Sequence, residues 1–319
     1  MPTLNKASRN GLSKATHDVG YDNANWNKSR TFVGMMTRLR KYLFTLVLLA
    51  LCLTDAQAQF KIYTRKARMA DFPAKTTMVV LSGDDLLDIA LKNEIKSRWR
   101  VSPFDFCYID EINEIKKNSN FYILYLSTEK SGLVYLNLEK CGEKESFSSL
   151  NSRMDIVKVP FGPKEFSTGR EIYYLSAMID IMQHYVENSL IRKHSNFFGL
   201  EKTHGSLIKE RKKKLYIARE DLSSEIPGRD SIPNPGDGLI YTDGFTVDSL
   251  FTASSSNAII GFCISSNSPS PNSESYQVIV SADRHELLYY KRRRYKDGAK
   301  RGFTSKELKA IQAEHAYRK

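Results

Sequence analysis

Apolar positions in the first half of the chain change from a continuous run to a four-residue spacing. The run contains β-branched residues and predicts a buried strand at Thr76–Leu81. A polar turn, Ser82 to Asp85, follows it. Behind the turn, four apolar residues recur at every fourth position: Leu87, Leu91, Ile95 and Trp99. This spacing predicts a helix with one face against a sheet.

Shorter apolar and aromatic stretches, separated by turn residues, continue this lobe. They predict a short helix at Asp110–Lys117 and four strands, at Phe104–Tyr108, Phe121–Leu126, Leu133–Leu138 and Met154–Phe161. The turn at Lys130 to Gly132 predicts that the strands on either side of it form a hairpin. This order of elements is typical of a mixed α/β sheet, so residues 59–161 are expected to form a first α/β lobe.

A long amphipathic stretch follows at residues 168–194. Thr168 and Glu171 fit the capping box S/T-x-x-E. Seven apolar residues then follow helical spacing: Ile172, Leu175, Met178, Ile179, Met182, Tyr185 and Val186. We interpret this stripe as the core-packing face of one long central helix. A partner-binding groove and a dimer-forming surface are the alternatives.

The last part of the chain, residues 207–319, has strand patterns separated by Pro- and Gly-rich connections. Strands are expected at Leu215–Ala218, Leu239–Tyr241, Ala258–Ile264, Tyr276–Ser281 and Glu286–Arg293, the last two as a hairpin. Asp221–Ile226 is expected to form a short helix. Thr304 and Glu307 predict a second capping box, at the start of a closing helix.

These patterns predict an α/β (or α+β) fold: lobes with mixed β-sheets, flanking helices and one long central helix. The lobes either form two domains or share one. The segment Val79–Leu86 resembles Leu215–Leu222, because both read strand, polar turn, acidic residues and leucine. A duplicated α/β unit would explain this similarity, although any two strand-to-helix junctions share these features.

Residues 36–58 have the three parts of a secretory signal. Basic residues lie between Arg38 and Lys41, an apolar run follows at Leu43–Leu53, and Ala56-Gln57-Ala58 is an A-x-A cleavage site. The apolar run is shorter than the about 20 residues that span a bilayer. We therefore expect cleavage after Ala58 and a periplasmic or extracellular protein, with an uncleaved anchor as the alternative.

Two further features concern this terminus. Leu49-Ala50-Leu51-Cys52 resembles a bacterial lipobox, in which the cysteine is lipidated, but the pattern requires a small residue where Leu51 stands. Membrane association through a lipid on Cys52 is therefore the less favoured outcome. Residues 1–34 are polar and lack apolar periodicity, which is typical of a disordered segment or of a leader upstream of the true start codon.

The chain is basic, with a formal net charge of +12. Without residues 1–58 the net charge is about +7, which favours an unknown envelope protein or an anionic glycan or lipid as partner, rather than nucleic acid. Cleavage leaves three cysteines: Cys107, Cys141 and Cys263. Exported proteins can form disulfides. Cys107 with Cys141 is the pair to consider, and buried free thiols are the alternative.

No motif in the sequence indicates a catalytic, cofactor or metal site. A phosphate-binding loop, H-E-x-x-H, G-x-S-x-G and C-x-x-C are all absent. Asp237 and Asp243 lie near glycines but lack the spacing of a calcium loop, which favours a turn. We therefore expect no cofactor, metal or catalytic residue. A triad assembled from distant residues is recognised by geometry, so an exported hydrolase remains an alternative.

Two groups of residues are candidates for binding. Ser82, Asp84 and Asp85 follow the first strand, and ligands often bind at this end of open α/β sheets. A helix cap is the alternative there. The second group is a basic run interleaved with tyrosines: Lys291, Arg292, Arg293 and Arg294. It fits an anionic surface or glycan, whereas its alternative role is to guard an edge strand against aggregation.

Within Thr76–Leu138, the segments VVLSGDDLLDIALKNEI, FDFCYIDEINEI and FYILYL resemble exported bacterial envelope proteins of unknown function. In element order they also resemble the amino-terminal lobe of TolB-type periplasmic proteins, although the second half has no propeller repeat. The resemblance implies an envelope α/β lobe and assigns no functional residue. The leading hypothesis is a non-catalytic binding or assembly component of the envelope. An exported hydrolase and a dimer-forming structural protein are the alternatives.

Overall fold

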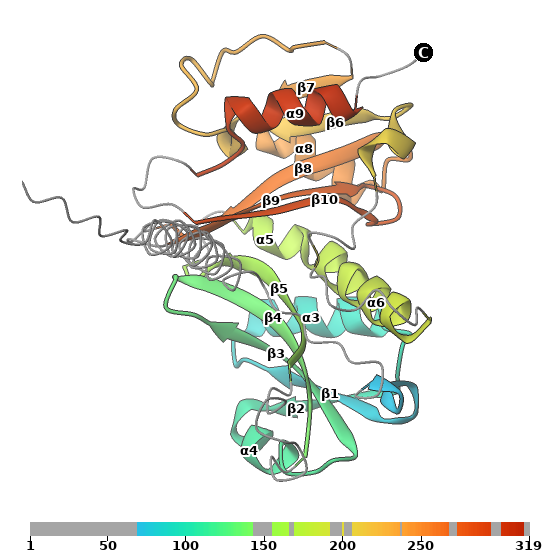
Figure 1. Cartoon of the computed structure of the whole chain (residues 1–319). Coiled ribbons are helices and arrows are strands. Elements are labelled where there is room, and N and C mark those ends of the chain that lie inside the picture. Colours follow the sequence, from blue (N-terminus) through green and yellow to red (C-terminus); the bar gives the residue numbers. More distant parts are fainter. Residues whose placement is uncertain are drawn as a thin grey trace, which may run out of the picture. The chain divides into compact units, whose positions relative to one another are not determined.

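A computed structural model gives the fold of the chain (Figure 1). It describes residues 69–142, 155–165, 169–191, 200, 206–236, 238–267, 273–294 and 301–315. Contacts divide the chain into two units, Met1–Gln59 and Phe60–Lys319, and every described residue belongs to the second unit. The expected leader, signal peptide and lipobox, including Cys52 and Ala58, therefore lie outside the described residues.

The first sheet has five strands, of which the first three are parallel. The elements of this lobe are η2 (Phe72–Ala74), β1 (Thr76–Leu81), α3 (Asp85–Arg98), β2 (Phe104–Tyr108), η3 (Ile109–Glu111), α4 (Ile112–Ile115), β3 (Phe121–Thr128), β4 (Leu133–Lys140) and β5 (Asp155–Pro163). The strand order is β2-β1-β3-β4-β5, with β4 and β5 antiparallel to their neighbours. The expected strands and the hairpin of β3 and β4 are confirmed, and the expected short helix is η3 followed by α4.

Helix α3 illustrates why the local sequence folds in this way. The side chain of Asp84 accepts a hydrogen bond from the backbone N–H of Leu87 at 3.0 Å, which satisfies a free donor at the start of the helix. The four apolar residues with four-residue spacing are all buried: Leu87, Leu91, Ile95 and Trp99. The predicted strip of core residues is therefore confirmed.

The second lobe repeats the topology of the first. Its elements are η5 (Leu207–Glu210), β6 (Lys214–Ala218), η6 (Arg219–Asp221), β7 (Leu239–Thr242), α8 (Gly244–Thr252), β8 (Ala258–Ser265), β9 (Glu274–Ser281), β10 (Leu287–Arg294) and α9 (Ser305–His315). The strand order is β7-β6-β8-β9-β10, again with the first three strands parallel and the last two antiparallel. The two sheets therefore match in strand order and directions, but among the described residues no α-helix follows β6 as α3 follows β1, so the similarity of the two strand ends does not extend to a duplicated strand-and-helix unit.

One prediction for this lobe is wrong, and one helix is not predicted. The expected helix at Asp221–Ile226 is absent, because Leu222 forms a β-bridge with Phe303 and holds the chain extended. Helix α8 has no counterpart among the predicted elements. By contrast, the capping box of α9 is confirmed, because Glu307 Oε2 accepts a hydrogen bond from the backbone N–H of Thr304 at 3.0 Å.

The expected long helix is two helices, α5 (Arg170–Tyr173) and α6 (Leu175–Ile191) (Figure 1). Helix α6 buries residues around most of its circumference: Leu175, Ser176, Ala177, Met178, Ile179, Ile181, Met182, Gln183, Tyr185, Val186 and Ser189. Its apolar residues belong to one core that also contains residues from α3, α8 and both sheets. The interpretation of the stripe as core is confirmed, and the two lobes share this core.

The described cysteines are free thiols. Cys107 and Cys141 lie buried in one small apolar cluster with Val80 and Ile123. The disulfide considered between them is absent, and the alternative of buried free thiols holds for Cys107 and Cys141, whereas Cys263 is only half-buried. Burial raises the pKa of the Cys107 thiol to about 11 and that of the Cys141 thiol to about 12.

Side chains occupy backbone donors on two edge strands. In β2, the N–H of Tyr108 donates to Glu111 Oε2 at 2.7 Å. In β7, the N–H of Tyr241 donates to Asn234 Oδ1 at 2.6 Å. These two donors are therefore not free to pair with a further strand.

A buried polar cluster joins the two sheets. The hydroxyls of Tyr135 in β4 and Tyr276 in β9 lie 3.2 Å apart. Tyr276 donates to Glu274 Oε2 at 2.6 Å, and Arg292 Nε donates to the same oxygen at 3.0 Å. Burial by itself raises the pKa of Glu274, but the hydrogen bonds from Arg292 and Tyr276 lower it overall. The carboxylate is thus kept charged inside the junction of the lobes.

Tyr276→Phe tests this junction. The substitution removes a donor to a buried carboxylate, so we expect the free energy of unfolding to fall by about 1–3 kcal/mol in urea denaturation. Tyr173→Phe is the matched control, because Tyr173 is 53% exposed. We expect this substitution to change the free energy of unfolding by no more than about 0.5 kcal/mol. Equal losses in the two variants would contradict a specific role for the Tyr276 hydroxyl.

Candidate functional site

The carboxyl ends of β6, β7 and β8 meet at one edge of the second sheet. The central strand is β6, and the chain leaves it for β7 on one side and then continues to β8 on the other. Open α/β sheets bind ligands at such a reversal of strand order. Asp221 lies directly behind β6, and its Oδ1 accepts a hydrogen bond from the backbone N–H of Cys263 in β8 at 3.2 Å. This edge therefore carries a buried carboxylate.

Arg170 brings a positive charge to this carboxylate. Its Nε donates to the two carboxylate oxygens of Asp248 at 3.1 and 2.9 Å, and its Nη1 donates to Asp221 Oδ2 at 3.4 Å. Its Nη2 donates to the hydroxyl of Tyr174 at 3.1 Å, and this hydroxyl donates to Asp248 Oδ1 at 2.6 Å. Glu220 lies 3.9 Å from the guanidinium. We call these five residues the Arg170 cluster.

The cluster ties three segments together that are distant in sequence. Arg170 and Tyr174 come from the segment of α5, Glu220 and Asp221 from η6, and Asp248 from α8. Gly244, the first residue of α8, leaves room for the side chain of Glu220, because a Cβ there would collide with Glu220 Oε1. A side chain at position 244 would therefore require this half-exposed carboxylate to shift.

Burial controls the protonation of the Arg170 cluster. It raises the pKa of Asp221 to about 6, although the positive charge of Arg170 opposes the rise. Burial disfavours the charged form of Arg170, but Asp221 and Asp248 raise the pKa of its guanidinium above the ordinary value. At neutral pH, one guanidinium therefore faces three carboxylates, those of Asp221, Asp248 and Glu220.

An open groove lies beside the Arg170 cluster, between α5 and α8, and we call it the α5/α8 groove. It has a volume of about 460 Å³ and six lining residues: Tyr173, Phe245, Asp248, Ser249, Thr252 and Ala253. Phe245 is 83% exposed and Tyr173 is 53% exposed. Asp248 belongs to both the groove and the cluster. Large exposed apolar side chains around a fixed polar group are typical of a binding surface.

The structure places the candidates Ser82, Asp84 and Asp85 at the equivalent edge of the first lobe. Asp84 caps α3, and the hydroxyl of Ser82 donates to Asp88 Oδ1 at 2.9 Å. The backbone N–H groups of Ser82 and Gly83 also donate to Asp88. Asp85 is exposed in the first turn of α3. These contacts form the helix cap that was the alternative to a binding site at this position.

The basic run lies on β10, an edge strand, and its side chains form ion pairs with two glutamates. Lys291 and Arg293 contact Glu307 of α9 at 3.2 and 3.3 Å. Arg292 and Arg294 contact Glu274. Glu307 and Glu274 thus neutralise part of the charge that was a candidate for anionic ligands, and the position on an edge strand agrees with the guarding role.

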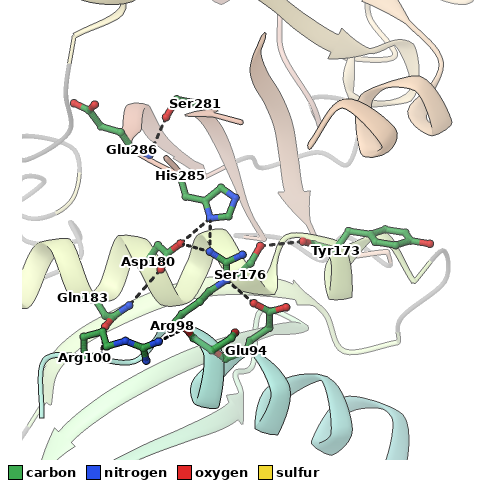
Figure 2. Close-up of polar contacts among 11 residues, drawn as sticks. Glu94, Arg98, Arg100, Tyr173, Ser176, Asp180, Gln183, Ser281, His285 and Glu286 are labelled. Atoms are coloured by element: carbon green, nitrogen blue, oxygen red, sulfur yellow. Dashed lines mark hydrogen bonds and ion pairs between the residues drawn. The ribbon is translucent and has the colours of Figure 1, made fainter. Parts of the chain in front are cut away.

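A second polar network joins α3, α6 and the turn between β9 and β10 (Figure 2). His285 Nδ1 lies 2.7 Å from Asp180 Oδ2, and Arg98 Nη1 donates to the same oxygen at 2.9 Å. The ring of His285 stacks on Phe251 of α8 with centroids 4.8 Å apart. His285 has a φ of 52°, a backbone conformation that most side chains avoid. The contacts with Asp180 and Phe251 hold it there.

The His285–Asp180 pair resembles two members of a hydrolytic triad, so it tests the alternative of an exported hydrolase. Within the part of the chain that the structure describes, no hydroxyl or thiol forms a hydrogen bond with His285. Ser82, the serine singled out above, instead bonds to Asp88. Among the same residues, no group of three or more His, Cys, Asp and Glu side chains could hold a metal ion.

Asp221→Asn tests the pKa of about 6 for Asp221. An unfolded-state pKa of 3.8 means that the carboxyl destabilises the fold as pH rises through 6. We expect the unfolding free energy of the unmodified protein, relative to Asp221→Asn, to fall by about 1.4 kcal/mol from pH 5 to pH 8. Asp243→Asn is the control, because Asp243 is exposed and hydrogen bonds with Thr246 lower its pKa to about 2. The same pH dependence in both comparisons would contradict the assignment.

The α5/α8 groove with the Arg170 cluster is thus the site that the geometry supports, and sequence spacing does not reveal it. Of its residues, Asp221 has the clearest sequence signal, because it corresponds to Asp85 in the similarity between the two strand ends. Comparison with protein-family models, with curated proteins and with solved structures finds no match for this chain.

Proposed function

We propose that this chain is an exported envelope protein that acts by binding, as a component of envelope assembly or maintenance, and that the α5/α8 groove is its binding surface. The proposal of export rests on the signal pattern of residues 36–58 in the sequence. The proposal of binding rests on one observation: two aromatic side chains, Tyr173 and Phe245, stay exposed beside the carboxylate of Asp248.

Burial of the exposed Phe245 side chain by a partner would contribute favourable free energy to binding. A phenylalanine side chain that is covered by a partner removes well over 100 Å² of surface from water, which contributes about 3 kcal/mol. The groove is also held in shape before binding, because Asp248 on its floor accepts hydrogen bonds from Arg170 and Tyr174. A preformed surface loses less conformational entropy when a partner docks.

The two alternative functions have less support. A dimer through the long helix would need an exposed apolar face, whereas α6 buries its apolar stripe in the shared core. A hydrolytic triad built on His285 would need a nucleophile that hydrogen-bonds to it, and none of the described hydroxyl or thiol groups does so. No helix in the described ranges is long and apolar enough to cross a membrane.

The export proposal predicts the N-terminal residue of the protein recovered from fractionated cells. Intact mass and N-terminal sequencing are expected to give Gln59 in the periplasmic or extracellular fraction, because cleavage follows Ala58. A lipidated N-terminus at Cys52 would place the protein on a membrane. An uncleaved chain in the cytoplasm would overturn the proposal of export.

The binding proposal predicts site-specific crosslinking. We expect a photoreactive phenylalanine analogue at position 245 to crosslink a discrete envelope protein in cells, because Phe245 lies in the groove. The same analogue at Ile191 is the control, since Ile191 is 76% exposed but lies outside the groove lining. Crosslinking from neither position, or the same products from both, would count against the groove as the binding surface.

A further inference from the structure

We infer that the α5/α8 groove takes a basic side chain, a lysine or arginine of a partner polypeptide. This inference rests on the proposed function, because it names the chemistry of the group that the same groove binds. Three observations carry it: the local balance of charge, the free acceptor capacity of Asp248 and the aromatic walls.

The charge balance at this edge is opposite to that of the whole chain. The chain has a net charge of +12. The segments that form the groove and the adjacent Arg170 cluster, which are α5, η6 and α8 with its cap, carry two cations, Arg170 and Arg219, against five acidic residues: Glu171, Glu220, Asp221, Asp243 and Asp248. Burial raises the pKa of Asp221 to about 6, so protonation of this carboxyl removes only part of the excess negative charge. A partner cation would neutralise more of it, and a partner anion would be repelled.

Asp248 has acceptor capacity left for such a cation. A carboxylate offers about four lone-pair positions. Asp248 Oδ1 accepts from Arg170 Nε and from the Tyr174 hydroxyl, whereas Arg170 Nε is the one donor to Oδ2 among the described residues. Asp248 also lines the groove. A donor in the groove can therefore bind Oδ2 without displacing Arg170.

The walls of the groove suit the rest of a basic side chain. Tyr173 and Phe245 present aromatic rings, which attract cations over their faces and pack against aliphatic stems. Ser249 and Thr252, on the α8 side, bring hydroxyl groups to the same lining. Lysine and arginine combine an apolar stem with a charged end, so they match a groove lined by two aromatic rings and a carboxylate.

Three capped peptides that differ in one side chain test the inference. The probes are Leu-Lys-Leu, its norleucine analogue without the charge and Leu-Glu-Leu, titrated into the full isotope-labelled chain. Amide shifts of Phe245, Ser249 and Thr252 report binding in the groove. We expect the lysine peptide to bind at least about tenfold more tightly than the norleucine peptide, with weaker binding at high salt, and the glutamate peptide not to bind.

Glu220→Gln gives a variant that removes charge without removing a buried group, because the Glu220 side chain is 49% exposed. We expect this variant to bind the lysine peptide about threefold more weakly, or weaker still, and to bind the norleucine peptide with unchanged affinity. Glu114→Gln is the matched control, since Glu114 is an exposed acid on α4 of the first lobe. Equal weakening by both variants would show a general charge effect and overturn the inference.

Equal affinities of the lysine and norleucine peptides would also overturn the inference, although apolar docking in the groove would stand. Absence of binding by all three peptides, with specific crosslinking from position 245 retained, would overturn the basic chemistry and keep the proposed function. Loss of the crosslinking itself would instead remove the groove as the binding surface.

Discussion

Helix α6 needs apolar cover on nearly all sides, and the rest of the structure depends on that requirement. Five consecutive residues at its start, Leu175 to Ile179, are buried, so no single sheet face can cover them. Helix α3 and strand β5 of the first lobe pack on α6, and the core that contains α6 also includes residues of α8 and of the second sheet. The two sheets are therefore joined through one hydrophobic core that includes α6.

The polar groups around α6 and α8 follow from this arrangement. Arg170 precedes α6 and holds Asp248 of α8, while Asp180 in α6 holds His285 of the second lobe. Phe251 of α8 lies between the two networks, edge-on to Tyr174 and stacked on His285. Buried ion pairs add little net stability but penalise alternative packings that would separate the charges. These contacts thus specify one orientation of α8, and with it the shape of the groove.

Local patterns predict the strands well because a buried strand needs only a short apolar run and a turn. Helix α8 is missed because only Val247 and Phe251 mark its buried side, and its cap, Asp243, also fits a turn. The site itself has no sequence motif, since Arg170, Asp221 and Asp248 come from three separate segments. The sequence candidates Ser82, Asp84 and Asp85 lie at the equivalent edge of the first sheet, where Asp88 accepts the hydrogen bonds of Ser82.

The occupied donors of β2 and β7 have a consequence for how the protein is recognised. Glu111 accepts from the edge N–H of Tyr108, and Asn234 accepts from that of Tyr241. A neighbouring chain cannot extend either sheet there without first displacing a side chain. At these two edges, backbone pairing with an extended peptide is therefore disfavoured, and recognition there depends on side-chain contacts. Aggregation of this chain with itself by strand pairing at β2 or β7 would require the same displacement of a side chain.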